Sequence, residues 1–310
     1  MPAFEQVLKK RENFRWIKGV EFNMTRVAFI GLGIMGSRMA KNLHRGGVSL
    51  IVHNRTKEKA EELLELGAEW ANSPKEAAEK ADIVFTMVSN PQIVEELFFN
   101  PENGLALGFK KGTLWIDSST VSPSFSRKMA GEASIRDCRF LDAPVSGSLI
   151  PAEKGELIFL VGGSQHDFEE AKPYFDMMGK VSHYLGETGK GSSMKLLINS
   201  MLAQDLAIFA ETLHLGVAMG FSKDQVMETL LNHPVSAPIL KGKRDKLMGE
   251  EYEAEFPLKH MQKDLHLVSE TAFELNRALP IANATKELYA QAKQNGLGDL
   301  DISAIYKWLK

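Results

Sequence analysis

The stretch RVAFIGLGIMGSRMAKNLHRGG, residues 26–47, decides the fold of this chain. Its first five residues are mostly aliphatic and aromatic, which is typical of a buried strand. After a glycine-rich turn, the apolar residues Met35, Met39 and Leu43 recur at helical spacing. A pair of glycines at the end of the stretch is typical of a helix terminus. The stretch therefore predicts a strand, a tight turn and a helix in succession.

The turn GLGIMG places Gly31, Gly33 and Gly36 in the pattern G-x-G-x-x-G. The pattern alone is weak evidence, but a preceding strand and a following helix are the context in which it binds a dinucleotide. The first glycine permits the tight turn, the second lets the backbone approach the pyrophosphate, and the third lets helix and strand pack closely. The N–H groups at the helix N-terminus attract the phosphates as well. We expect these cofactor contacts from the turn: Gly31, Leu32, Gly33, Ile34, Met35 and Gly36.

The end of the second predicted strand, VSLIVHNR, bears on the choice of cofactor. NAD-dependent enzymes place an Asp or Glu there, about 20 residues after the glycines, to bind the ribose hydroxyls. This sequence has Asn54, Arg55 and Thr56 instead, and the first carboxylate is Glu58. We expect Arg55 to face an adenosine 2′-phosphate, with Asn54 and Thr56 as hydrogen-bonding partners, which favours NADP(H). The alternative is a solvated arginine at a strand end.

The rest of the chain divides into two patterns. Short apolar strands alternate with helical stretches as far as about residue 185, which indicates βαβ units. From Gly191 onward the apolar spacing is helical. The sequence predicts an α/β Rossmann domain with a doubly wound, mostly parallel sheet, followed by an all-α C-terminal domain. The expected parts are an N-terminal extension at 1–23, an NADP-binding Rossmann domain at 24–187 and an all-helical substrate and dimerisation domain at 188–310.

Composition excludes several classes of function. The 310 residues carry a net charge of −3, so neither a nucleic-acid-binding nor an anionic-membrane-binding surface is indicated. No apolar run reaches the roughly 18 residues of a membrane span. Residues 1–23 lack the apolar core of a secretory signal, and Met24 is an alternative start. The single cysteine, Cys138, is typical of a reducing compartment, so we expect a cytoplasmic protein, and the eight histidines show no metal-ligand spacing.

Two polar turns follow predicted strands, WIDSSTVSP at 115–123 and LDAPVSGS at 141–148. In open α/β sheets, ligands bind at the carboxyl edge of the strands. The hydroxyl and N–H groups of these turns suit a carboxylate, and two turns on one edge favour a binding site over ordinary capping turns. The second turn lacks the G-x-S-x-G elbow of a hydrolase nucleophile. The candidate residues are Ser119, Thr120, Ser146 and Gly147.

A lysine stands at the start of an apolar helix in GKGSSMKLLIN, residues 189–199. Lys195 and Asn199 lie one helical turn apart on the same face. An unpaired ammonium in a buried position costs several kcal/mol, so a buried Lys195 would indicate function. The alternative is a lysine whose stem packs while its amine reaches solvent.

In order, the segments FIGLGIMG, NRT, DSSTV, PVSGS with PAEKGEL, GKGSSMKLLIN, FPLKHMQKD and GLGDLDISAI resemble the β-hydroxyacid dehydrogenase family. That family includes 3-hydroxyisobutyrate dehydrogenase and 6-phosphogluconate dehydrogenase. The serine at position 148 is the residue common at that position in the subgroup that reduces glyoxylate and succinic semialdehyde, so the chain resembles that subgroup most. The resemblance runs from about Thr25 to the C-terminus and implies an active site in a cleft between the two domains.

The resemblance also implies roles for individual residues. Lys195 would be the catalytic lysine, with Asn199 beside it. Ser119, Ser146 and Gly147 would hold a substrate carboxylate, and Phe256 and Asp264 would line the same region. The further cofactor contacts would be Val88, Ser89, Thr120 and Lys263.

The function expected from these observations is NADPH-dependent reduction of a small aldehyde acid, with Lys195 as general acid. The alternative enzyme is an NAD(P)-dependent dehydrogenase of 3-hydroxyisobutyrate or another β-hydroxy acid. The non-enzyme alternative is a structural protein of the N-PAC type, which lacks the catalytic lysine. We expect a small-molecule carboxylate substrate, no metal, no nucleic-acid or membrane partner, and a homodimer or homotetramer.

Overall fold

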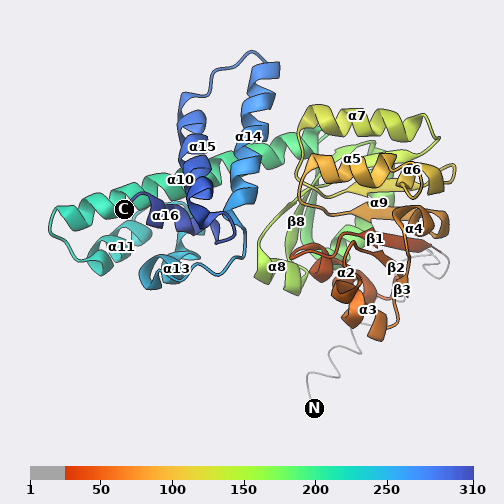
Figure 1. Cartoon of the computed structure of the whole chain (residues 1–310), viewed down its shortest axis with the longest axis horizontal. Helices are drawn as coiled ribbons and strands as arrows, with labels where there is room; N and C mark the ends of the chain where they lie inside the picture. The colour runs from red at the N-terminus through yellow and green to blue at the C-terminus, as the bar shows by residue number, and fades with distance from the viewer. Residues whose placement is uncertain (1–24) are drawn as a thin grey trace.

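The computed structural model describes residues 25–310, and the extension predicted at 1–23 and Met24 lie outside them. Figure 1 shows a sheet flanked by helices and a second group of helices beside it, joined by one long helix. The sheet lies in the first part of the chain, as the alternation of strands and helices predicts, and the predicted fold class is confirmed.

The sheet follows the order β3-β2-β1-β4-β5-β6-β8-β7, with β9 paired to β8. All pairs from β3 to β6 are parallel, and β8 runs antiparallel to β6 and β7. The chain order reverses between β1 and β4, which is the switch point of a doubly wound sheet. The strands are β1 Arg26–Ile30, β2 Ser49–His53, β3 Glu69–Trp70, β4 Ile83–Thr86, β5 Leu114–Asp117, β6 Arg139–Asp142, β7 Val145–Ser146, β8 Leu157–Gly163 and β9 Gly179–Tyr184.

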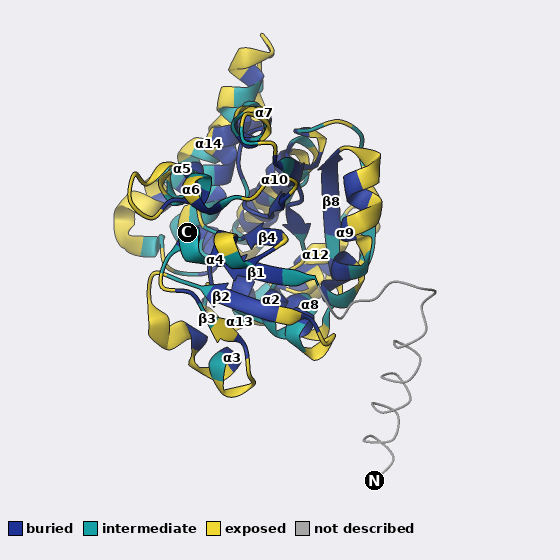
Figure 2. Ribbon diagram, turned by 90° about the vertical axis from the view of Figure 1, so that its right-hand side faces the viewer, coloured by how far each residue is buried: buried dark blue, intermediate teal, exposed yellow. Residues whose placement is uncertain are grey.

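Helices cover both faces of the sheet, because its central strands are apolar on both sides. On β1, Val27 and Phe29 pack toward α2 and α9, whereas Ala28 and Ile30 pack toward α4, α5 and α7. Figure 2 shows the strands β1, β2, β4 and β8 as mostly buried and the outer sides of the helices as exposed. These helices are α2 Gly36–Arg45, α3 Glu61–Glu65, α4 Pro74–Lys80, α5 Pro91–Phe99, α6 Leu105–Gly108, α7 Pro123–Ser134, α8 Leu149–Lys154 and α9 Gln165–Met178.

The helical part begins with α10, Lys190–Ala218, which packs against β8 at its start and against α14 and α15 further on. Ser222 caps α11 through a capping box with Gln225, which fixes the turn after α10. A separate apolar core holds these helices together. They are α11 Lys223–Asn232, α12 Pro238–Lys241, α13 Arg244–Gly249, α14 Leu258–Glu274, α15 Pro280–Ala292 and α16 Ile305–Trp308.

A buried ion pair joins the loop before α14 to the C-terminal segment. The Lys243 ammonium lies 3.0 Å from the carboxylate of Asp301 and 3.0 Å from that of Glu255. Asp301 also accepts hydrogen bonds from the backbone N–H groups of Glu255 and Phe256. Lys243 and Asp301 therefore hold in place the loop that carries Phe256.

Among residues 25–310, one helix is long and apolar enough to cross a membrane by length and composition, and it is α10, with a mean hydropathy of 1.3. Eleven of its residues are buried against the sheet and the other helices. These contacts are those of the core helix of the helical part. Its opposite face is apolar and exposed, with Leu197, Met201, Ile208 and Leu215 each at least 60% exposed.

Candidate active site

A cavity of about 480 Å³ lies at the carboxyl ends of β1 and β4 and continues to the start of α14. The reversal of strand order at β1 and β4 opens a crevice there, where doubly wound sheets bind ligands. The sheet supplies the glycine turn, Arg55 and Thr120, and the helical part supplies Phe256 and Lys263. The cavity therefore joins residues from both parts of the chain.

The glycine turn has the geometry that a dinucleotide needs. Gly31 has a φ of +99°, and a Cβ there would lie 2.3 Å from the Met87 carbonyl oxygen. A Cβ on Gly36 would lie 1.9 Å from the carbonyl oxygen of Gly31, so only glycine allows this close packing. At Gly33 no atom of the described residues lies within 4 Å of that position, so the backbone is open to the cavity. The residues present fit a bound pyrophosphate.

The three cofactor residues predicted at the end of β2, Asn54, Arg55 and Thr56, differ in their contacts. Asn54 accepts a hydrogen bond from the N–H of Leu32 at 3.0 Å and donates one to the carbonyl of Thr56 at 2.9 Å. It therefore ties the glycine turn to the strand end. Arg55 is exposed and lines the cavity. Thr56 and the buried Leu32 do not line it.

The turn after β5 holds Ser119 in a buried position. Its backbone N–H donates to the Asp117 carboxylate at 3.1 Å, and its hydroxyl oxygen accepts from the N–H of Val88 at 3.0 Å. The Thr86 hydroxyl also donates to the Asp117 carboxylate. Burial raises the pKa of Asp117 to about 6. Three residues beyond the strand ends line the cavity: Val88 and Ser89 after β4, and Thr120 after β5.

Asn199, Lys263 and Asp264 form a linked polar group at the wall of the cavity. Asn199 donates to the Asp264 carboxylate at 2.6 Å, and the Lys263 ammonium lies 2.8 Å from the same carboxylate. Lys263 also donates to the Thr120 carbonyl at 2.6 Å, which bridges the helical part and the sheet. Lys263 and Asp264 line the cavity, whereas Lys195 and Asn199 lie on α10 and do not line it.

Lys195 is half-buried on α10, and its loss of contact with water changes the acidity of its ammonium. Desolvation lowers the pKa of its ammonium to about 8, helped by the positive charge of Lys263 and opposed by the negative charge of Asp264. Lys195 therefore lies within electrostatic reach of both groups. An ammonium with this pKa is mostly protonated at pH 7 and loses its proton at moderately alkaline pH.

Two predicted substrate residues, Ser146 and Gly147, lie outside the cavity lining. Ser146 is half-buried at the end of β7, and Gly147 is exposed with a φ of +128°. A Cβ on Gly147 would lie 2.9 Å from the Leu157 side chain, so the turn requires glycine. Neither residue, nor Ser119, lines the cavity.

The structure adds cavity residues that sequence reasoning missed. His53 lines it at the end of β2, and burial lowers the pKa of its imidazole. Asn100 and Asn103 follow α5, where the Asn100 side chain accepts from the N–H of Asn103 at 2.9 Å. An Asn-rich turn after a helix was the available signal, but nothing local relates it to the glycine turn about 70 residues earlier.

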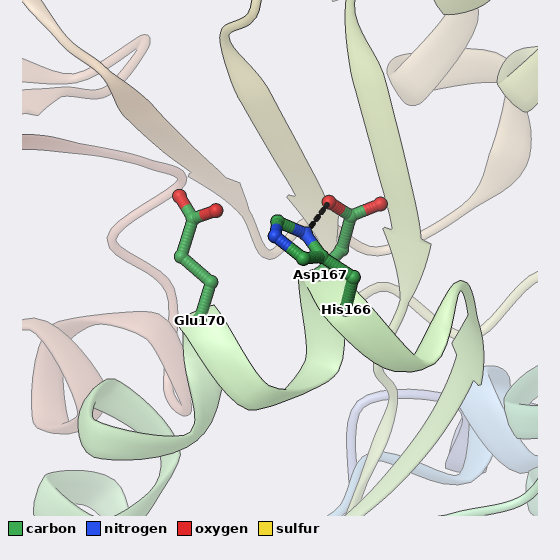
Figure 3. A group of neighbouring side chains, drawn as sticks. All are labelled: His166, Asp167 and Glu170. Atoms are coloured by element: carbon green, nitrogen blue, oxygen red, sulfur yellow. Dashed lines mark ion pairs between the residues drawn. The ribbon is translucent and has the colours of Figure 1, made fainter.

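One cluster in the described residues has metal-ligand geometry. His166, Asp167 and Glu170 on α9 place one ligand atom each within 4.8 Å of the others. Figure 3 shows the three side chains on neighbouring turns of the helix, with His166 paired to Asp167. The Arg139 guanidinium donates to Asp167 at 2.9 Å and to Glu170 at 3.0 Å. These bonds account for the cluster as an ion-pair network that joins β6 to α9.

Comparison with known proteins identifies the family. Residues 26–186 match the NAD-binding domain of 6-phosphogluconate dehydrogenase. Residues 189–309 match the NAD-binding domain model of NADP-dependent 3-hydroxyisobutyrate dehydrogenase. Two relatives from Arabidopsis thaliana are 38% identical: glyoxylate/succinic semialdehyde reductase 2, chloroplastic, over 94% of this chain and 81% of the relative, and glyoxylate/succinic semialdehyde reductase 1, over 92% and 98%.

Solved structures agree with this assignment. A 3-hydroxyisobutyrate dehydrogenase from Salmonella typhimurium is 27% identical, with a TM-score of 0.83 over 91% of this chain and 99% of the other. The 3-hydroxyisobutyrate dehydrogenase of Mycobacterium tuberculosis is 28% identical, with a TM-score of 0.81 over 93% and 99%. The recognition made from the sequence motifs is confirmed, and the chain belongs to the β-hydroxyacid dehydrogenase family of NAD(P)-dependent oxidoreductases.

Proposed function

We propose that this chain reduces a small aldehyde acid, glyoxylate or succinic semialdehyde, to the hydroxy acid with NADPH. The observation that carries the proposal is the half-buried Lys195 ammonium on α10, whose pKa is lowered to about 8 and which lies within electrostatic reach of Asp264 and Lys263, two residues that line the cavity. The names of the two reductases that are 38% identical support the substrate class.

Lys195 is the proposed general acid. NADPH, held by the glycine turn and Arg55, would supply the hydride for the carbonyl carbon, and negative charge would develop on the carbonyl oxygen. The Lys195 ammonium stabilises that charge and donates its proton to the oxygen. Asn199 holds the Asp264 carboxylate, whose charge keeps the lysine protonated near neutral pH. In the reverse oxidation, the neutral amine of Lys195 accepts the hydroxyl proton.

The substrate carboxylate is proposed to bind at the polar turns. Ser119 is held rigidly by Asp117 and the N–H of Val88, and its hydroxyl can donate its hydrogen to an anion. Ser146 and Gly147 would complete this site from the turn after β7, with Phe256 and Asp264 on the opposite side. Fixing the carboxylate sets the distance and angle of hydride transfer, which is a large part of the rate gain in such reactions.

The test is NADPH consumption with the purified protein against glyoxylate, succinic semialdehyde, tartronate semialdehyde and methylmalonate semialdehyde. We expect the highest kcat/KM with one of the first two. Because one methylene in a pocket is worth only about 1–3 kcal/mol, the preference among them is expected to be graded. No turnover of any of the four compounds would refute the proposed function.

A second candidate is oxidation of 3-hydroxyisobutyrate or a related β-hydroxy acid with NAD(P). The solved 3-hydroxyisobutyrate dehydrogenases that superpose over most of this chain favour it. Initial rates in both directions with both cofactors separate the two candidates. A higher kcat/KM for 3-hydroxyisobutyrate with NAD than for any aldehyde with NADPH would select this second activity.

We expect Arg55→Ala to raise the KM for NADPH about 10- to 100-fold, since a hydrogen bond to a charged group contributes roughly 1.5–3 kcal/mol. The KM for NADH, which has no 2′-phosphate, should change less than about twofold. Lys57→Ala is the control, because Lys57 is an exposed cation two residues away that does not line the cavity. Equal losses for both cofactors in Arg55→Ala would show that Arg55 does not bind the 2′-phosphate.

We also propose that the exposed face of α10 packs against a second copy of this chain. Its apolar residues Leu197, Met201, Ile208 and Leu215 continue into an apolar groove lined by Leu279 and Ile281. Light scattering should give at least twice the mass of one chain, and Met201→Glu should shift the protein toward the monomer. Ile135→Glu, at an apolar position on the sheet part that is at least as exposed, is the control. A monomer in the unmodified protein would exclude the interface.

A further inference from the structure

We propose that Asp142 is a positioning residue for the reaction: its carboxylate caps α10 from the neighbouring strand and thereby sets where Lys195 stands. The inference rests on the proposed role of Lys195. Asp142 ends β6 and is 1% exposed. It belongs to none of the motif positions to which the family resemblance gives a role.

The hydrogen bonds of Asp142 reach the start of α10. One carboxylate oxygen accepts from the N–H of Gly189 at 2.7 Å, and the other accepts from the N–H of Ser192 at 2.8 Å. The helix has no side-chain cap of its own, because its N-cap residue is Gly189. Helix N-termini leave their first N–H groups unpaired, and a carboxylate is a strong acceptor for them. Asp142 therefore supplies the cap that the helix sequence lacks.

Two glycines open the space for this carboxylate. A Cβ on Gly162 of β8 would lie 2.6 Å from a carboxylate oxygen of Asp142. A Cβ on Gly191 would lie 2.6 Å from the Asp142 carbonyl oxygen and 2.3 Å from the Leu160 carbonyl oxygen. The first turn of α10 consequently rests directly on the backbone of β6 and β8. This close fit determines the height of the helix above the sheet.

The position of the first turn matters for the proposed chemistry. Lys195 follows Ser192 by three residues, so a shift of the capped turn carries the lysine with it. Its other neighbours, Asp264 and Lys263, belong to α14, and Lys263 is tied to the Thr120 carbonyl on the sheet. Asp142 and Lys263 thus fix α10 and α14 separately to the ends of adjacent strands, β6 and β5. Between them they set the distance from the lysine amine to a substrate at that edge.

Asp142→Asn tests the role with little change of volume. The asparagine keeps one acceptor but turns an NH₂ group toward the other backbone N–H, so one of the two bonds is lost. We expect kcat to fall about 100-fold, the scale of an active-site displacement near 1 Å, with the dissociation constant of NADPH unchanged within about twofold. The pKa that limits kcat for reduction, expected near 8 in the unmodified protein, should rise as water reaches Lys195.

Hydrogen exchange gives a readout that needs neither cofactor nor turnover. The amides of Gly189 and Ser192 should exchange faster in Asp142→Asn, whereas those of β1 should not. Asp167→Asn is the matched control, since Asp167 is a buried carboxylate that pairs with Arg139 on the same strand, away from the cavity. It should lower stability without moving kcat or its pKa.

The outcomes separate this inference from the role of Lys195. Suppose that Lys195→Ala is inactive, whereas Asp142→Asn folds and has the same kcat and the same limiting pKa as the unmodified protein. Asp142 is then structural only, and the inference fails. If Lys195→Ala keeps its activity, the proposed function fails first. Should Asp142→Asn not fold, Asp142→Ser leaves room for a water molecule as acceptor and serves for the same measurements. Loss of folding in both variants would also overturn the inference, because it would mark a requirement for stability.

Discussion

Lys195→Ala is expected to lower kcat for aldehyde reduction about 10²–10⁴-fold, the usual range for loss of a general acid. The alanine removes both the proton donor and the positive charge that meets the developing alkoxide. NADPH should still bind, because the glycine turn and Arg55 line the cavity whereas Lys195 does not. Stopped-flow rates of NADPH oxidation and fluorescence titration of NADPH binding measure the two effects separately.

The pH dependence supplies a sharper form of the same prediction. Reduction requires the protonated amine, so log kcat should be flat below the pKa of Lys195 and fall as pH rises through about 8. For oxidation the sign reverses, and the rate should rise through the same pH. In Lys195→Ala this transition should disappear from both profiles.

Lys259→Ala is the control for Lys195→Ala. Lys259 is exposed on α14 and pairs with Asp299, so its loss removes one positive charge without changing the contacts among Asn199, Lys263 and Asp264. It should keep kcat within about twofold, as expected for a surface ion pair. Turnover of Lys195→Ala close to that of the control would remove the lysine from the mechanism.

Lys243→Met is expected to lower the free energy of unfolding by about 3–5 kcal/mol, the usual cost of removing one partner of a buried ion pair. Methionine fills the space of the lysine stem but leaves the carboxylate of Asp301, which is 0% exposed, without its cation. The positive charge of Lys243 helps to lower the pKa of Asp301, so the loss should raise that pKa. Urea denaturation followed by circular dichroism measures the change.

Two further variants serve as controls for the stability of Lys243→Met. Lys172→Met breaks an exposed pair with Asp176 on α9 and should cost less than about 1 kcal/mol. The double variant Lys243→Met, Asp301→Asn removes both charges and should recover part of the loss. If Lys243→Met were no less stable than Lys172→Met, the buried pair would contribute nothing net, and the loop carrying Phe256 would be held by its apolar contacts alone.

Much of the fold could be read from local patterns. The glycines at 31, 33 and 36, between a strand and a helix, predicted the turn that now lies at the switch point of the sheet. The alternation of apolar strands with helices predicted the Rossmann sheet, and the change to helical spacing predicted the all-α part. These predictions succeed because side-chain periodicity and the steric freedom of glycine act within a few residues.

The candidate site could be predicted only residue by residue. The motifs pointed to Lys195, Asn199, Ser119 and Lys263, but gave no distances between them. The sequence offered no reason to single out Asp142, Lys243 or the asparagines after α5. Each of these acts through a partner that is distant along the chain, such as the pairs Gly189–Asp142 and Lys243–Asp301, 47 and 58 residues apart.

The sequence alone determined the fold class and the family of this protein, because both follow from short motifs whose geometry is set by neighbouring residues. Only the tertiary structure shows what surrounds the lysine. The half-buried Lys195 is desolvated in part by the packing of α14, which brings Asp264 and Lys263 within electrostatic reach, and Lys263 is itself bound to the Thr120 carbonyl 143 residues away. The pKa of an amine responds to burial and to nearby charge, and both are properties of the packed molecule rather than of the helix that carries it.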